Sequence, residues 1–224
     1  MRLQLAAPQP AGKSWTIADS VCDSQQTRDL TPGERREYDS QPHEGRRRDW
    51  LAGRRAAKEA VAAHCGVPAT HVRLVPRDGS APTAVLRDDD TTPRALPISI
   101  SISHCDGRGI AVVADHPARV GVDLERAGHI ERDHLRYFLS PAEWLVAERA
   151  GATLVWALKE AAWKALGLTD ATPFSALRLA IDRASALRGV WLHGDWIPAT
   201  ARWWRVDECL LAAAVYVDPV AESR

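Results

Sequence analysis

The chain has 224 residues, a formal net charge of zero and a hydrophobic share of 46%. A chain of this length can bury a core without disulfides, and the balance of charge excludes a protein that binds polyanions over its whole surface. The four cysteines form no Cys-x-x-Cys pair, so we expect reduced thiols. The N-terminus has no apolar signal-peptide core and no apolar run is long enough to span a membrane, so we expect a cytoplasmic protein.

Two helices are predicted early in the chain. Residues 1–29 carry no pattern that we can interpret, but Leu30-Thr-Pro-Gly-Glu34 has a threonine cap, a proline in the first turn and a glutamate at the third helical position. A second helix is predicted over Trp50–Ala60. The densest positive patch of the chain surrounds its start. Its members are Arg46, Arg47, Arg48, Arg54 and Arg55.

Strands are predicted next. Pro76–Pro97 is rich in proline and aspartate and is predicted to be a long loop, and Ile98–Ser103 and Ile110–Ala114 have strand composition. Asp115-His-Pro-Ala-Arg119 is the natural place for a join.

The second half repeats this order. Leu139-Ser-Pro-Ala-Glu143 has the same helix-start pattern, and Trp156–Leu166 is a helix that ends at Gly167. Strands follow at Trp203–Val206 and Leu210–Val217. The sequence therefore predicts an α+β protein of two similar halves, 1–117 and 118–224. Duplicated halves pack face to face and ligands favour such interfaces, so we expect the active site there.

A set of carboxylates is the best candidate for chemistry. Val120–Glu125 has strand composition, so Asp123 and Glu125 leave one face together, and Glu160 and Lys164 share a face of the later helix. Three such oxygen ligands suit Mg²⁺ with substrate phosphate. The alternative is that Asp123 and Glu125 lie on the exposed face of an edge strand without a function, and that Glu160 forms an ordinary ion pair with Lys164.

Phosphate ligands are predicted in the first half. Ser101 and Ser103 share a strand face and His104 follows them, although a histidine taken alone favours a structural role over that of a ligand. The arginine patch could likewise be a solvated helix face, since acidic residues surround it. Zero net charge and the absence of a nucleic-acid-binding motif argue against a nucleic-acid partner.

Together, Gly121-Val-Asp-Leu-Glu125, the Trp156–Leu166 helix and Ser101-Ile-Ser-His104 resemble the 4′-phosphopantetheinyl transferases of the surfactin-synthetase-activating type. The resemblance runs from about Thr31 to Val217. It implies two similar α+β halves related by a pseudo-two-fold axis, with coenzyme A between them. It also implies transfer of the phosphopantetheine arm of coenzyme A to a serine of an acyl or peptidyl carrier protein, the reaction of a holo-acyl-carrier-protein synthase.

The resemblance implies roles for the candidate residues. Asp123, Glu125 and Glu160 would hold Mg²⁺, with Mn²⁺ as an alternative, and Glu160 would take the serine proton directly or through a water. Lys164 would neutralise the pyrophosphate and the leaving group, with Lys159 close to the same ligand. Residues of the first half would bind phosphate oxygens. These are Arg46, Arg54, Ser103, His104 and, more weakly because its loop departs from the family pattern, Arg77.

Two other functions fit the same residues. Water in place of the serine would give a coenzyme A diphosphate hydrolase, and loss of turnover would give a module that only binds coenzyme A or a carrier protein. The second is disfavoured because Asp123, Glu125 and Glu160 are all present. Two halves that pair with each other need no second chain, so we expect a monomer, and the two-half form of the family favours a role in polyketide or nonribosomal peptide biosynthesis.

Overall fold

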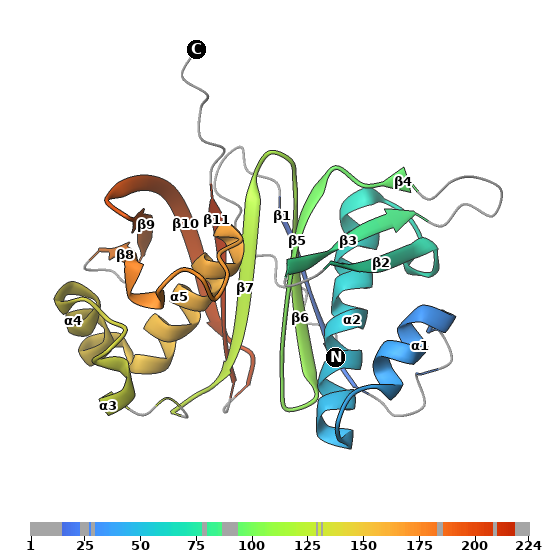
Figure 1. Ribbon diagram of the computed structural model, residues 1–224, viewed down its shortest axis with the longest axis horizontal. Coiled ribbons are helices and arrows are strands. Elements are labelled where there is room, and N and C mark those ends of the chain that lie inside the picture. The colour runs from blue at the N-terminus through green and yellow to red at the C-terminus, as the bar shows by residue number, and fades with distance from the viewer. Residues whose placement is uncertain are drawn as a thin grey trace, which may run out of the picture. The chain divides into compact units, whose positions relative to one another are not determined.

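The computed structural model describes residues 15–22, 27, 30–77, 80–86, 94–128, 130, 132–182, 186–207 and 210–217. The chain divides into two compact units, Met1–Asp115 and His116–Arg224. Each unit packs helices against antiparallel strands (Figure 1), so the prediction of an α+β fold is confirmed. No helix among the described residues is long and apolar enough to cross a membrane.

The first unit is built on a three-stranded sheet in the order β1-β6-β5. These strands are β1 (Trp15–Val21), β5 (Ile98–Cys105) and β6 (Arg108–Asp115). The long helix α2 (Glu44–Cys65) lies along this sheet (Figure 1) and buries an alanine-rich face against it. Gly109 of β6 makes the close fit feasible, because a Cβ there would stand 2.2 Å from the backbone of Ala52.

A second small sheet corrects the prediction of a long loop over Pro76–Pro97. This sheet has the order β2-β3-β4, and two of its strands fall within that stretch. The strand β3 was not predicted because it contains Pro82, and proline usually argues against a strand. Pro82 lies where the pairing of β2 with β3 shifts register, and an irregularity of this kind tolerates a residue without an N–H. The strands are β2 (Val72–Arg77), β3 (Ser80–Leu86) and β4 (Arg94–Ala95), preceded by a 3₁₀ helix at Ala69–His71.

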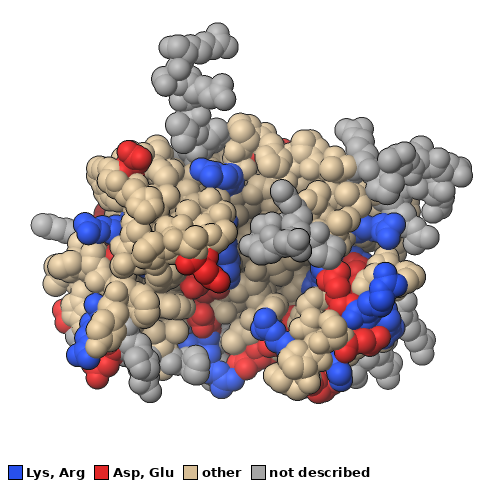
Figure 2. Space-filling model, viewed as in Figure 1, with Lys and Arg blue, Asp and Glu red and all other residues tan. Residues whose placement is uncertain are grey.

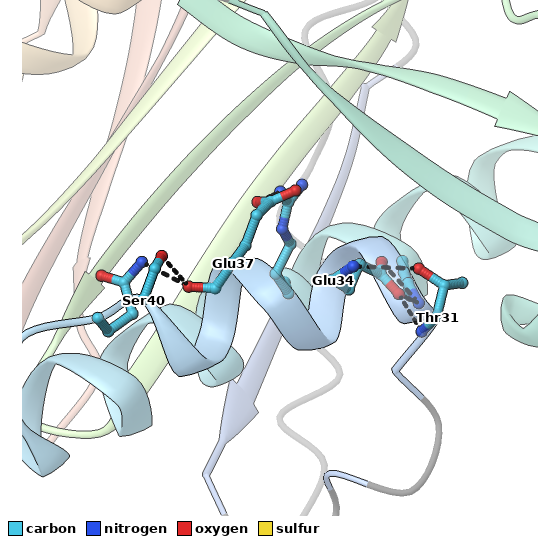
Figure 3. Close-up of polar contacts among 7 residues, drawn as sticks. Thr31, Glu34, Glu37 and Ser40 are labelled. Atoms are coloured by element: carbon cyan, nitrogen blue, oxygen red, sulfur yellow. Dashed lines mark hydrogen bonds and ion pairs between the residues drawn. The ribbon is translucent and has the colours of Figure 1, made fainter.

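The helix start predicted at Thr31 is confirmed. Helix α1 (Pro32–Asp39) begins after Thr31, whose hydroxyl accepts from the Glu34 backbone N–H while the Glu34 carboxylate accepts from the Thr31 N–H. Figure 3 shows this reciprocal pair at one end of α1 and Ser40 at the other. Glu34 also forms an ion pair with Lys58 of α2 at 2.9 Å, so a single buried carboxylate ties the two helices together.

The second unit is built on a five-stranded antiparallel sheet in the order β7-β11-β10-β9-β8. Helix α5 (Ala152–Leu166) packs against β7 and β11, and the core lies between them. The unit contains two further helices, α3 (Arg132–Leu135) and α4 (Pro141–Ala150), and a 3₁₀ helix at Phe174–Ala176. The strands are β7 (Arg119–Arg126), β8 (Leu177–Ile181), β9 (Leu187–Leu192), β10 (Asp195–Arg205) and β11 (Leu210–Val217).

The start of α4 and the end of α5 lie where the sequence predicts, whereas α5 begins at Ala152, four residues before the predicted start at Trp156. Ser140 and Glu143 form the same reciprocal cap at the start of α4, and Gly167 ends α5 in the left-handed region with φ of 66°. Among the described elements, each unit runs from a strand through helices, two in the first unit and three in the second, to a 3₁₀ helix behind a proline and then further strands. Each unit therefore contains the predicted succession of a capped helix, a second helix and then strands.

Candidate active site

The candidate carboxylates of the second unit lie where β7 meets α5. Gly121 lets the two elements touch, because a Cβ at this position would stand 1.9 Å from the carbonyl oxygen of Ala161 and 2.6 Å from the amide nitrogen of Ala165. Successive residues of a strand alternate in direction, so Asp123 and Glu125 leave β7 on the same face as Gly121. The strand acids therefore point toward the helix that carries Glu160 and Lys164.

Lys164 joins the helix to the strand by two contacts. Its ammonium donates to Asp123 Oδ1 at 2.6 Å and to the carbonyl oxygen of Val122 at 3.3 Å. Asp123 is buried and Lys164 is part-exposed. A charge-assisted bond between groups of this kind is short and strong, and here it brings a positive charge into the carboxylate group.

Glu125 is the carboxyl group most affected by this neighbourhood. Burial, followed by the charge of Asp123, raises the pKa of Glu125 to about 7, while the Trp156 indole N–H and Lys164 oppose the rise. The indole of Trp156 donates to Glu125 Oε1 at 3.2 Å. At neutral pH this carboxyl is therefore divided between its charged and neutral forms.

Glu160 belongs to the same electrostatic group. Burial raises the pKa of Glu160, Lys164 opposes this rise and Asp123 adds to it. Glu160 in turn raises the pKa of Glu125. The acids that the sequence singled out thus act on one another within one unit, around one lysine. Lys164 therefore does more than form an ordinary ion pair with Glu160 on its own helix, because it binds Asp123 of the strand.

The carboxylates are oxygen donors of the kind that hard divalent cations prefer. Hard carboxylate oxygens that raise one another's pKa values are what a small divalent cation would compensate. Among the described residues, however, no three acid, histidine or cysteine side chains stand in an arrangement that could hold a metal ion as they are. The ammonium of Lys164 on Asp123 already supplies part of the compensating charge.

Lys159, which the resemblance places close to the same ligand, is paired with another acid in this structure. Its side chain is fully buried and its ammonium contacts Glu143 Oε1 at 3.0 Å. Successive helical residues are rotated by about 100°, so the neighbours Lys159 and Glu160 leave α5 in different directions. Burial lowers the pKa of Lys159, and the charge of Glu143 opposes this change.

An aromatic cluster beside Glu125 was not predicted from the sequence. Phe174 contacts Trp156 and Trp163 with ring centroids 5.0 and 5.1 Å apart, and Phe138 contacts both Trp156 and Phe174 edge-on. Of these four rings, only Trp156 and Trp163 belong to a helix that the sequence predicted. Phe174 follows a proline in an irregular stretch, so no periodic signal could have shown that it packs against α5.

The candidate residues of the first unit divide into exposed and buried groups. Arg46 is exposed near the start of α2, whereas Arg54 is buried, forms an ion pair with Glu37 and lies 5.0 Å from the centre of the Trp50 ring. The acidic and basic side chains on the face shown in Figure 2 are interspersed rather than separated by sign.

The strand candidates of the first unit lie on β5. Ser101 and Ser103 are buried, and His104 is half-buried against α2, where a Cβ on Gly53 would stand 3.3 Å from the His104 ring. The turn after β5 is held by Asp49 of α2, which accepts from the Gly107 N–H at 2.5 Å. Arg77 ends β2, and its side chain lies outside the described residues.

The family comparison covers the part of the chain that carries the carboxylates. Residues 119–212 match a family model, which takes in β7, α5 and the strands up to the start of β11. The family is the 4′-phosphopantetheinyl transferase superfamily. The match spans less than half of the chain, and it includes Asp123, Glu125, Glu160 and Lys164. No curated protein matches the chain.

Proposed function

We propose that this protein transfers the 4′-phosphopantetheine group of coenzyme A to a serine of a carrier protein. The observation that carries the proposal is the group of Asp123, Glu125 and Glu160 around Lys164, inside the stretch that matches the transferase superfamily. Phosphoryl transfer depends mainly on positioning and charge neutralisation, and this group offers acid ligands, a base and a cation together.

In the proposed reaction the serine oxygen forms a bond to the β-phosphorus of coenzyme A. The bond from that phosphorus to the leaving adenosine 3′,5′-bisphosphate breaks, and the serine proton passes to Glu160, directly or through a water. A hydroxyl is a weak nucleophile until a base removes its proton. Burial raises the pKa of Glu160, which makes its carboxylate a stronger base than an exposed one. Lys164 stabilises the negative charge that grows on the leaving phosphate.

A divalent cation completes the proposal. Asp123, Glu125 and Glu160 would hold Mg²⁺, or Mn²⁺ in its place, and the ion would neutralise pyrophosphate oxygens. The donor type suits such an ion, because Asp123, Glu125 and Glu160 are three hard oxygen donors and the charge of Asp123 helps to raise the pKa of both glutamates. Lys164 would then exchange part of its contact with Asp123 for a phosphate oxygen, a movement that its part-exposed side chain allows.

The finer assignments rest on the resemblance to the surfactin-synthetase-activating type. They give Arg46, Ser103 and His104 contacts with the phosphates of coenzyme A, and we favour Arg46 over Arg54 for the 3′-phosphate because Arg54 is already bound to Glu37. They also favour polyketide or nonribosomal peptide carriers and a monomer. Affinity for 3′-dephospho-coenzyme A tests the arginine: it should bind more weakly than coenzyme A to the wild type but not to Arg46→Ala.

Intact-protein mass spectrometry of apo-carriers tests the function. An apo-acyl carrier and an apo-peptidyl carrier are each incubated with the protein, coenzyme A and Mg²⁺, and we expect a gain of one phosphopantetheine. Glu160→Gln should lower the rate by about 10²–10⁴-fold, the usual contribution of a general base. Glu148→Gln is the matched control, because Glu148 is an exposed glutamate on α4 that contacts Trp144.

The outcomes separate the candidate functions. Release of phosphopantetheine without any gain of carrier mass would replace the transferase by a coenzyme A diphosphate hydrolase. Binding of coenzyme A without either product would indicate a binding module. A mass gain that persists in Glu160→Gln would remove Glu160 from the role of base.

A further inference from the structure

A buried ion pair links three elements behind the candidate site. Glu143 and Lys159 are both almost inaccessible to solvent, with exposed fractions of 1% and 0%. The Glu143 carboxylate accepts from Lys159 and from the Leu179 N–H of β8 through Oε1, at 3.0 and 2.9 Å, and from the Ser140 N–H through Oε2 at 2.7 Å. One carboxylate therefore holds the start of α4, the middle of α5 and the strand β8.

This ion pair and Gly121 hold α5 from nearly opposite sides. Ala161, which meets β7 at Gly121, follows Lys159 by two residues and so leaves the helix about 200° away from it. Glu160 lies between them, about 100° from each. A helix held at two opposite sides cannot rotate about its axis, and the direction of Glu160 is therefore fixed.

The Phe174 ring extends this arrangement to the strand acids. The Lys159 ammonium lies 5.5 Å from the centre of the Phe174 ring, and the other contacts of Phe174 include Trp156, which donates to Glu125. Lys159 therefore contacts the aromatic packing beside Glu125 and belongs to the helix that carries Glu160. It has no exposed surface through which a phosphate could reach it.

We propose that Lys159 is a positioning residue, which acts through its ion pair with Glu143 to fix the rotation of α5 and with it the direction of Glu160. It is not a ligand of coenzyme A, although it directly precedes Glu160 in the sequence. This inference rests on the proposed function for its kinetic part only, because the effect on α5 can be measured without turnover.

The first unit provides a matched control. Glu34 is also a buried capping glutamate, and it forms an ion pair with Lys58 of α2, just as Glu143 does with Lys159 of α5. Lys58→Met and Lys159→Met therefore remove the same kind of contact from the two units. Only the second removal should alter the orientation of Glu160.

The experiment measures the turnover number, coenzyme A affinity by calorimetry and amide hydrogen exchange for both variants. For Lys159→Met we expect a turnover number lower by about 10²-fold, the usual result of misplacing a catalytic group by about 1 Å. We expect the dissociation constant of coenzyme A to change less than about threefold, well below the tenfold that about 1.4 kcal/mol represents, and exchange to rise in α4 and α5. For Lys58→Met we expect faster exchange in α1 and α2 and an unchanged turnover number.

A second variant covers a failure to fold. Lys159→Met leaves the Glu143 charge buried alone, so the double variant Lys159→Met/Glu143→Gln removes both charges and keeps an amide oxygen as acceptor. The same turnover loss with unchanged coenzyme A affinity is expected.

Three outcomes would overturn the inference. These are a dissociation constant raised tenfold or more, an unchanged turnover number, and exchange in α5 equal to that of the wild type. If the wild type modified no carrier, the proposed function would fail, and the affinity and exchange data would still decide whether Lys159 is a ligand or holds α5.

Discussion

Substitution of Gly121 by alanine should separate β7 from α5. The added Cβ would stand 1.9 Å from the carbonyl oxygen of Ala161, and ordinary contact begins at 3.4 Å, so one element must move by about 1.5 Å. The nearest atoms are backbone atoms and cannot rotate away. Overpacking usually costs about 1–3 kcal/mol, and we expect a loss of unfolding free energy at the upper end of that range.

The same movement should carry Glu160 and Lys164 away from the strand acids. A displacement of about 1 Å in a catalytic group can lower a rate by about 10²-fold, so carrier modification should fall at least that far. Urea unfolding measures the first effect and the mass gain of an apo-carrier measures the second.

Gly194→Ala is the control for this substitution. Gly194 has φ of 97° and nothing within 4 Å of an added Cβ, so alanine there should cost only about 1–2 kcal/mol of backbone strain and leave the rate unchanged. A Gly121→Ala protein with the wild-type unfolding midpoint and the wild-type rate would refute the reasoning. It would mean that the contact between β7 and α5 does not determine the position of the carboxylates.

Three further predictions concern charge. The pKa of Glu125 is about 7 in the folded protein against 4.5 ordinarily, so the folded state binds this proton more tightly and stability should fall as pH rises from about 4.5 through 7. Glu125→Gln should make the urea midpoint fall less over this pH range. A fall equal to that of the wild type would contradict the prediction. Trp156→Phe removes the indole N–H donated to Glu125 and should cost about 1–3 kcal/mol at pH 8 but less at pH 5, where the acid is neutral; equal losses at both pH values would argue against the bond. Arg54→Ala should lower stability by about 1–3 kcal/mol because it leaves Glu37 without its ion pair. Arg46 is exposed, so Arg46→Ala should change stability by less than about 0.5 kcal/mol. A larger loss of thermal stability in Arg46→Ala than in Arg54→Ala would overturn this prediction.

Helix ends and the acid pattern could be predicted from local sequence because their causes are local. A threonine or serine followed three residues later by glutamate caps a helix through contacts within one turn, and Thr31 and Ser140 do so here. Alternation along β7 likewise placed Asp123 and Glu125 on one face.

Partners that depend on tertiary contact could not be predicted from the sequence. The same Glu143 that caps α4 also binds Lys159, and nothing in a helix pattern shows that a capping acid will accept a distant lysine. The resemblance places Lys159 near the ligand of Glu160, yet in this structure its ammonium contacts Glu143. The strand β3 was missed for a related reason, because its pairing with β2 accommodates Pro82 through an irregularity that local rules treat as an end.

The two units share two kinds of contact to a helix, α2 in the first unit and α5 in the second, and differ in what the strands present to that helix. In each unit a glycine lets a strand lie against the helix backbone: Gly109 of β6 lies against α2, and Gly121 of β7 lies against α5. In each unit a capping glutamate also forms an ion pair with a lysine of that helix. β7 then adds two carboxylates opposite α5, whereas β5 presents His104 to α2. The shared contacts hold the helix against its strand, and under the proposed function the acids that follow Gly121 in β7 would determine the chemistry. Substitution of those acids should lower the activity with little loss of stability, whereas substitution of Gly121 should lower both the activity and the stability.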